Sequence, residues 1–330
     1  MTGFVERIRQ GDAKGLIARN GIFIAFIAFM IAFGIGSDKF LSFNNLESVV
    51  RSSAMIGVMA LGVTIVVISG NLDLSVGSML SFGTVMVVDL HDKIGPGPAI
   101  LVMMVCVLLL GAVNGFLIGF VRLNSLIVTL GMLSAIQGLT LIYSGGKNVD
   151  VDPSTQDLTW FRIFGRGEVA GVDMPIIIFF ALAIVIGFVV AFTPYGRRVY
   201  AVGGNPTAAV FSGIRRNRVV FSTYLISAFC VGIASIILGS RVMGSQNNVG
   251  QGYELLVLAS VILGGTSLLG GSGSILKTVI GVLILGFIQN GLLLLGYPYF
   301  AQWIVTWVVI ILAVWLDVAA KRGRLLSPIA

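Results

Sequence analysis

Long apolar runs alternate with short polar joints along almost the whole chain. A run of about 20 apolar residues is long enough to cross a ~30 Å hydrocarbon core as a helix. Helices are expected because lipid offers no hydrogen-bond partners to an exposed backbone. The pattern predicts an all-α, polytopic transmembrane helical bundle of about ten spans. They cover residues 21–36, 49–69, 76–90, 97–121, 125–143, 175–193, 219–239, 254–269, 275–295 and 299–317. The span at 76–90 is short enough to be partial or tilted.

Composition supports a membrane protein and excludes a soluble domain. Of the 330 residues, 57% are hydrophobic and 11% are charged, whereas soluble domains have about 25% charged residues. The chain also has 43 glycines. Small residues allow helix backbones to approach closely in lipid, so some of these glycines are expected at helix–helix contacts.

The charges predict an orientation. With the N-terminus inside, 14 of the 21 Lys and Arg but only four of the 14 acidic residues fall on the inner side, as the positive-inside rule requires. We therefore expect a cytoplasmic segment at 1–20, one transmembrane domain at 21–317 and a cytoplasmic tail at 318–330. No cleavage site follows the first apolar run, which predicts a retained span. The net charge of +7 reflects topology, and we expect no nucleic-acid partner.

Two joints between spans are long. Residues 144–174, predicted outside, contain several acids and aromatic residues. They could form a docking surface for an external partner or an amphipathic cap on the bundle. Residues 194–218, predicted inside, are longer than a turn between helices needs.

The inner joint contains a helix-start signal. Gly203 and Gly204 are expected to break the chain, Asn205 to cap a helix and Pro206 to occupy its first position. A short helix would run from Pro206 to Ser212 and end at Gly213. Either a soluble partner docks on this helix, or lipid head groups hold it at the interface. The docking candidates are Asn205, Pro206, Thr207, Ala208, Ala209, Val210, Phe211, Ser212 and Gly213.

No catalytic motif is recognisable. The chain has no G-x-x-x-x-G-K-[ST] phosphate loop, no nucleophile elbow and no His/Cys metal cluster. Its one histidine, His91, lies in a joint, and Cys106 and Cys230 lie in apolar runs. We expect no enzyme activity, no catalytic residue, no metal and no cofactor in this chain. If transport uses ATP, another chain hydrolyses it.

Polar residues near membrane depth are unfavourable unless they are partnered or face water. Asn71, Asp73 and Ser75 stand between Gly70 and Gly77. They could belong to a broken helix that faces a water-filled path, or to a tight turn in which Asp73 or Ser75 caps the next helix, and both can hold together.

A second glycine-rich stretch, at 264–274, predicts a sharp break between spans. Its pattern of Ser and Gly is weakly similar to that of residues 69–78, and an internal duplication of this kind is common in transporters.

Further polar residues could line a path. Amides and a tyrosine suit neutral, hydroxyl-rich solutes, because they supply donors and acceptors without charge. The alternatives are hydrogen bonds between helices for Asn114, Gln289 and Asn290, and a solvated outer loop for 246–251. The path candidates are Asn71, Asp73, Ser75, Asn114, Tyr253, Glu254, Gln289 and Asn290, with Asn124, Gln137, Gln246, Asn247, Asn248 and Gln251 as additional polar positions.

Three stretches resemble one family. They are SGNLDLSVGS at 69–78, YAVGGNPTAAVFSGI at 200–214 and GYELLVLASVILGGTSLLGGSGS at 252–274. Their order and spacing are similar to those of the membrane permease subunits of ribose-type ATP-binding cassette (ABC) importers. The resemblance covers roughly residues 20–320. The broad family also includes permeases for other pentoses and hexoses, inositol and the furanosyl signal autoinducer-2.

The resemblance implies a type II ABC importer fold in the bacterial inner membrane, surrounded by lipid, and a system of several chains. A second permease chain, identical or similar, would complete the path. ATP-binding subunits would hold ATP and Mg and dock on the Asn205–Gly213 helix. A periplasmic binding protein would deliver a sugar-like solute. The alternatives are an autonomous secondary carrier or channel, and an exporter or lipid-handling scaffold.

Overall fold

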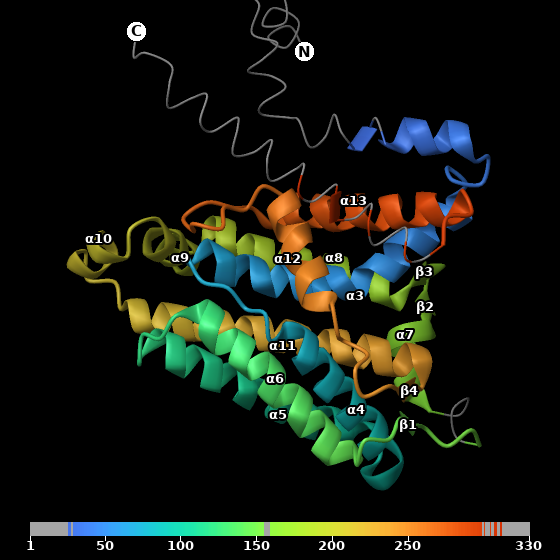
Figure 1. Cartoon of the computed structure of the whole chain (residues 1–330), viewed down its shortest axis with the longest axis horizontal. Coiled ribbons are helices and arrows are strands. Elements are labelled where there is room, and N and C mark those ends of the chain that lie inside the picture. The colour runs from blue at the N-terminus through green and yellow to red at the C-terminus, as the bar shows by residue number, and fades with distance from the viewer. Residues whose placement is uncertain are drawn as a thin grey trace, which may run out of the picture. The chain divides into compact units, whose positions relative to one another are not determined.

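The computed structural model describes residues 26–27, 29–154, 159–298, 300, 304, 307–308 and 311. The predicted segment 1–20, the tail 318–330 and much of the first and tenth predicted spans lie outside these residues. The described part is mostly helical and divides into two compact units. One comprises residues 1–50 and 283–330, and the other residues 51–282. Figure 1 shows the helices and the few short strands between them.

Six helices in the described residues are long and apolar enough to cross a membrane. They are α3 (Phe43–Ile68), α5 (Pro96–Gly119), α6 (Ser125–Ser144), α8 (Met174–Phe192), α11 (Arg216–Val242) and α13 (Ile275–Leu294). The α4 helix (Val76–Ile94) is of similar length, but three charged residues, Asp89, Asp92 and Lys93, stand near its end. The helical fold is confirmed, and the count of ten spans stays a prediction.

The larger unit is built around α4, whose residues from Val76 to Val88 are all buried. It packs against α5, α6 and α11. Three glycines spaced four residues apart in α5, Gly111, Gly115 and Gly119, allow α11 to approach closely. A Cβ on Gly115 would lie 2.9 Å from the Phe221 carbonyl oxygen, and one on Gly119 would lie 2.8 Å from that of Asn217. These are the close helix contacts expected from the glycine content.

The smaller unit has its own apolar core. Phe40, Val49 and Phe287 are buried there, and partly buried side chains pack around them. Asn45 and Asn290 exchange two hydrogen bonds between their side-chain amides, of 2.9 and 3.0 Å. Each amide thereby satisfies a donor and an acceptor of the other.

The segment between α6 and α8, which the structure describes except for residues 155–158, has little regular structure. It contains β1 (Val149–Asp150), η1 (Trp160–Arg162), α7 (Ile163–Arg166), β2 (Glu168–Val169) and β3 (Val172–Asp173). The β1 strand pairs antiparallel with β4 (Gly244–Ser245), with Val149 opposite Ser245, and β2 pairs with β3 in the same sense.

Side-chain hydrogen bonds connect this segment to the end of α4. The His91 ring lies 2.7 Å from Asp92 Oδ1 and 2.8 Å from Thr159 Oγ1, and the fully buried Phe161 packs beside it. The geometry fits the expected cap on the bundle, while docking of an external partner stays a prediction.

Several predicted boundaries were wrong. The α12 helix (Tyr253–Leu263) stops six residues before the predicted end of the eighth span, at 269. Gly264 and Gly265 end it, and Gly265 has φ +79°, which L side chains rarely adopt. At 11 residues α12 is about 16 Å long, roughly half of a ~30 Å core. The predicted seventh span, 219–239, is longer as α11, and the second, 49–69, begins at Phe43 as α3.

The inner joint at 194–218 holds two helices, where only one was predicted. They are α9 (Pro194–Gly204) and α10 (Pro206–Phe211). Gly203 and Gly204, expected to break the chain, form the last turn of α9. The chain turns instead at Asn205, with φ −153° and ψ 95°.

Candidate functional site

The α10 helix is held by local capping chemistry. The Asn205 side chain accepts a hydrogen bond of 2.9 Å from the Ala208 backbone nitrogen, and Pro206 takes the first helical position. The helix ends at Phe211, one residue before the predicted end, with Ser212 as its C-cap and Gly213 following at φ +80°. These are the start and stop signals that the sequence contains. Phe211 is 87% exposed, so α10 presents an apolar side chain that the described part of the chain leaves largely uncovered.

The α9 helix was missed, although its start carries the same signal. Thr193 Oγ1 accepts a hydrogen bond from the Gly196 nitrogen at 3.5 Å, and Pro194 follows it at the first helical position. The hydroxyl of Tyr200 donates to the Gly273 carbonyl oxygen at 2.9 Å. This bond ties α9 to the loop that follows α12.

Glycines from all three motif stretches meet beside α9, at a cluster we call the glycine junction. It consists of Gly70, Gly203, Gly204, Gly270 and Gly271. A Cβ on Gly270 would lie 2.6 Å from Gly70 Cα and 2.9 Å from the Gly203 carbonyl oxygen. A Cβ on Gly203 would lie 2.7 Å from the Gly271 nitrogen. Only glycine allows these backbones to touch, and the contact joins the ends of α3 and α9 to the loop at 264–274.

The polar residues between α3 and α4 form a buried network. Asp73, 2% exposed, accepts hydrogen bonds from the Ser75 nitrogen (3.2 Å), the Ser75 hydroxyl (2.6 Å) and the Ser227 hydroxyl (2.9 Å). The Asn114 amide donates to Ser75 Oγ at 2.8 Å. Asn71 is also buried and donates to Ser69. The network links the turn to α5 and α11 and holds the tight turn before α4, although the helix itself has no side-chain capping hydrogen bond at its N-cap, Ser75.

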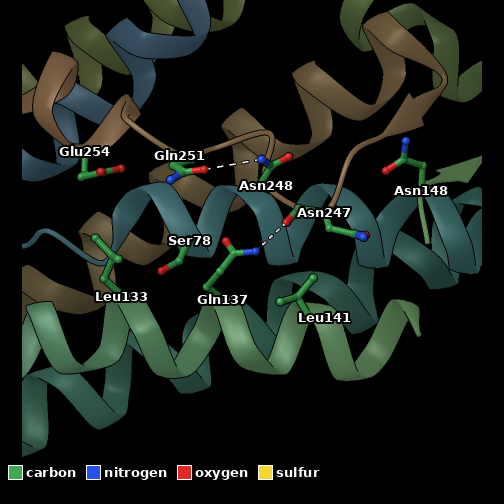
Figure 2. Close-up of a pocket in the computed structure, with 9 residues that line it drawn as sticks. All are labelled: Ser78, Leu133, Gln137, Leu141, Asn148, Asn247, Asn248, Gln251 and Glu254. Atoms are coloured by element: carbon green, nitrogen blue, oxygen red, sulfur yellow. Dashed lines mark hydrogen bonds between the residues drawn. The ribbon is translucent and has the colours of Figure 1, made fainter. Parts of the chain in front are cut away.

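A cavity of about 400 Å³ lies elsewhere in the larger unit, within the usual range for small-molecule sites. Figure 2 shows Gln137 between two leucines on the α6 side, and amides of the 247–251 segment opposite. Gln137 Nε2 donates to the Asn247 carbonyl oxygen at 2.9 Å. The lining residues are Ser78, Leu133, Gln137, Leu141, Asn148, Asn247, Asn248, Gln251 and Glu254.

The cavity lining offers neutral donors and acceptors and one carboxylate. Asn247 is only 8% exposed, and its Oδ1 has no hydrogen-bond partner among the described residues. Buried polar atoms are normally paired, and this oxygen is an exception. The Glu254 carboxylate accepts from the Gly252 nitrogen at 3.1 Å. The nine lining residues include no Lys, Arg or His.

The cavity therefore gathers some of the predicted polar residues and leaves out others. Of the path candidates, Glu254 lines it, together with four of the additional polar positions: Gln137, Asn247, Asn248 and Gln251. The network residues Asn71, Asp73, Ser75 and Asn114 do not line it.

The remaining polar candidates have other places. Tyr253 begins α12 next to Glu254, and Gln246 is exposed. Asn124 caps α6 by accepting from the Leu126 nitrogen at 2.9 Å. Gln289 and Asn290 belong to the smaller unit, where Asn290 makes the hydrogen bonds between helices that were the alternative for it.

Four lining residues were missed: Ser78, Leu133, Leu141 and Asn148. Gln137 and Leu141 are four residues apart on α6 and so share a helix face, which could have indicated the leucines. No group of three His, Cys, Asp or Glu in the described part of the chain could hold a metal ion.

Comparisons with known proteins identify the family. The model of the family described as branched-chain amino acid transport system / permease component matches residues 45–314. The ribose import permease protein RbsC of Bacillus subtilis is 36% identical, over 92% of this chain and 94% of that protein. The Escherichia coli K12 ribose import permease is also 36% identical, over 94% of this chain and 96% of its own length.

The L-arabinose transport system permease protein AraH of Escherichia coli K12 is 34% identical, over 92% of both chains. No solved structure matches the chain. The predicted resemblance to ribose-type permeases is confirmed. Together with the long apolar helices, these matches show that the chain is a multi-pass membrane protein that belongs to the branched-chain amino acid transport system permease family.

Proposed function

We propose that this chain is the transmembrane permease subunit of an ABC importer that moves a monosaccharide, or a similar small polyol or furanosyl solute, into the cytoplasm. It is supported above all by the cavity of about 400 Å³, since six of its nine lining residues carry an amide or a hydroxyl group. Such groups bind neutral hydroxyl-rich solutes without requiring a charge on them. Relatives named for ribose and L-arabinose transport support the same class of solute.

In this proposal the energy comes from a separate ATP-binding subunit, which holds ATP and Mg and docks on α10 in the cytoplasm. Two features support this role: α10 is capped at both ends, and Phe211 projects from it almost fully exposed. An exposed aromatic side chain is the usual anchor of a protein interface. In this proposal the N- and C-termini are cytoplasmic like α10, as the distribution of Lys and Arg predicts.

The other proposed partners are a second permease chain, identical or similar, and a periplasmic binding protein that delivers the solute. The folded segment 144–174 is the proposed contact for the binding protein, at the outer face of the bacterial inner membrane. The permease then needs only weak affinity, because the delivering protein captures the solute and tight binding would slow release.

In this scheme, transport proceeds as the path opens alternately to the two sides of the membrane. Movement of α10 on the ATP-binding subunit is transmitted through α9 to the glycine junction, where three backbone segments are in direct contact. The ends of α3 and α12 lie at or near this junction, so their positions respond to α10. The amide groups of the cavity exchange hydrogen bonds with the solute while it passes.

ATP hydrolysis by the assembled system tests whether a separate subunit supplies the energy for transport. The purified chain alone is expected to hydrolyse no ATP, and the complex with its ATP-binding subunit is expected to hydrolyse it faster when the binding protein is loaded. Replacing residues 205–213 by a flexible linker of the same length should abolish the stimulation. ATP hydrolysis that responds normally to the loaded binding protein in the linker variant would contradict the docking role.

A further inference from the structure

The cavity carries a single ionisable group, the Glu254 carboxylate, at one end. Figure 2 shows Glu254 and Asn148 at opposite ends of the row of lining residues, with the amides of Asn248 and Gln251 between them. The other lining residues are uncharged. In a cleft with low-dielectric walls, one uncompensated charge sets the sign of the local potential.

The position of this carboxylate is fixed by its surroundings. Glu254 stands in the first turn of α12, and its two oxygens lie 3.2 and 3.1 Å from the Gly252 nitrogen. Gly77 on α4 leaves the space the carboxylate needs, because a Cβ at Gly77 would collide with Glu254 Oε2 and lie 2.7 Å from the Gly250 carbonyl oxygen. The charge is therefore pressed against the α4 backbone.

The carboxylate also has free acceptor capacity. A carboxylate oxygen can accept two hydrogen bonds, so Glu254 keeps acceptor capacity beyond its bond to Gly252. Hydroxyl groups can donate to these oxygens, whereas phosphate and carboxylate groups bring acceptors and negative charge. The Leu133 and Leu141 side chains on the α6 side offer an apolar surface to C–H groups.

We propose that Glu254 is a specificity-determining residue, which makes the cavity a subsite for uncharged polyols and excludes anionic solutes such as sugar phosphates and sugar acids. The proposal rests on the proposed function for the identity of the natural solute. The charge selection itself is a property of the cavity, and it can be measured on the isolated chain.

The test uses a cysteine in the cavity and thiol reagents of opposite charge. Leu133→Cys is introduced with Cys106→Ala, while the fully buried Cys230 is kept and its background labelling subtracted. The full chain in lipid nanodiscs is labelled with a cationic and an anionic methanethiosulfonate reagent of similar size. The ratio of the two rates is measured with Glu254, with Glu254→Gln and with Asp150→Asn. Asp150 is an exposed acid two residues from Asn148 that does not line the cavity.

With Glu254 in place, the cationic-to-anionic rate ratio is expected to exceed that of a free thiol by roughly 10-fold or more, since clefts of one sign concentrate counter-ions to that extent. Glu254→Gln should bring the ratio close to its value for a free thiol, and Asp150→Asn should leave it unchanged. An equal ratio for Glu254 and Glu254→Gln overturns the proposal. Failure of sugar uptake by the assembled transporter, with the charge selection intact, would instead overturn the proposed function.

Discussion

The Gly271 nitrogen donates a hydrogen bond of 2.9 Å to the carbonyl oxygen of Ile68, the last residue of α3. The helix end would otherwise leave this carbonyl without an intrahelical partner. The bond lies within the glycine junction, beside Gly203 in the last turn of α9. Because Asn205 follows α9 and starts α10, the proposed docking helix is two residues away from a backbone contact between three motif stretches.

Gly203→Ala is expected to disrupt this junction. Its Cβ would collide with the Ile68 carbonyl oxygen and lie 2.7 Å from the Gly271 nitrogen, and both are backbone atoms that cannot rotate away. Overpacking of this kind destabilises by about 1–3 kcal/mol or more. A lower thermal unfolding midpoint in detergent and weaker coupling of ATP hydrolysis to uptake should result.

The matched control is Gly138→Ala on α6, where a Cβ meets nothing within 4 Å. It should leave stability unchanged or raise it by about 0.5–1 kcal/mol, because alanine favours a helix over glycine. If Gly203→Ala behaves like Gly138→Ala in both assays, the glycine junction is neither tightly packed nor needed for coupling.

Phe211→Ala separates docking from folding. Because Phe211 is 87% exposed, its truncation should change the unfolding midpoint very little. Loss of an aromatic side chain that anchors an interface weakens binding by about 2 kcal/mol or more. The affinity for the ATP-binding subunit should therefore fall roughly 30-fold or more. Unchanged affinity, measured by titration of the two purified components, would place the docking contact elsewhere.

Two substitutions of Asp73 distinguish a structural role from a role in the path. Asp73→Ala leaves the donors of Ser75 and Ser227 without their acceptor. Each buried unpaired group costs about 1–3 kcal/mol, so thermal unfolding should show a large loss of stability. Asp73→Asn keeps one acceptor oxygen and should retain most of the stability of the unaltered chain. A stable Asp73→Ala protein that folds normally but no longer transports would instead favour the water-filled path.

The close approach of α5 and α11 can be tested at Gly115. A Cβ there would lie 2.9 Å from the Phe221 carbonyl oxygen and 3.1 Å from Phe221 Cα. Gly115→Val should therefore force the helices apart and reduce the yield of monodisperse protein on size-exclusion chromatography. Gly131→Val on α6, where nothing lies within 4 Å, is the control and should behave like the unaltered chain.

Local chemistry explains which elements the sequence could predict. The α10 helix follows from a side-chain cap and a proline next to each other in the chain. The same logic applied to Thr193 and Pro194 would have predicted α9. The eighth span was extended too far because the apolar pattern continues through Gly264 and Gly265 to Leu269, whereas the backbone turns at Gly265.

The site depended on contacts that a linear pattern does not contain. Amide-bearing residues were expected to line a path, but the sequence could not show that Gln137 would contact Asn247, 110 positions away. Nor could it show that Asp73 would pair with Ser227 on α11 and so lie in a buried network outside the cavity. The glycines of three motifs were each expected at breaks, and their meeting at one junction emerges only from the fold.

Solute uptake into proteoliposomes distinguishes a subunit of an ATP-driven importer from an autonomous carrier. The chain is reconstituted with its ATP-binding subunit, and radiolabelled D-ribose and L-arabinose are supplied with the periplasmic binding protein encoded beside it. We expect at least one of the two sugars to accumulate only when ATP is present on the side of the ATP-binding subunit, and the chain alone to accumulate neither. Accumulation by the chain alone, driven by an ion gradient and independent of ATP, would contradict it.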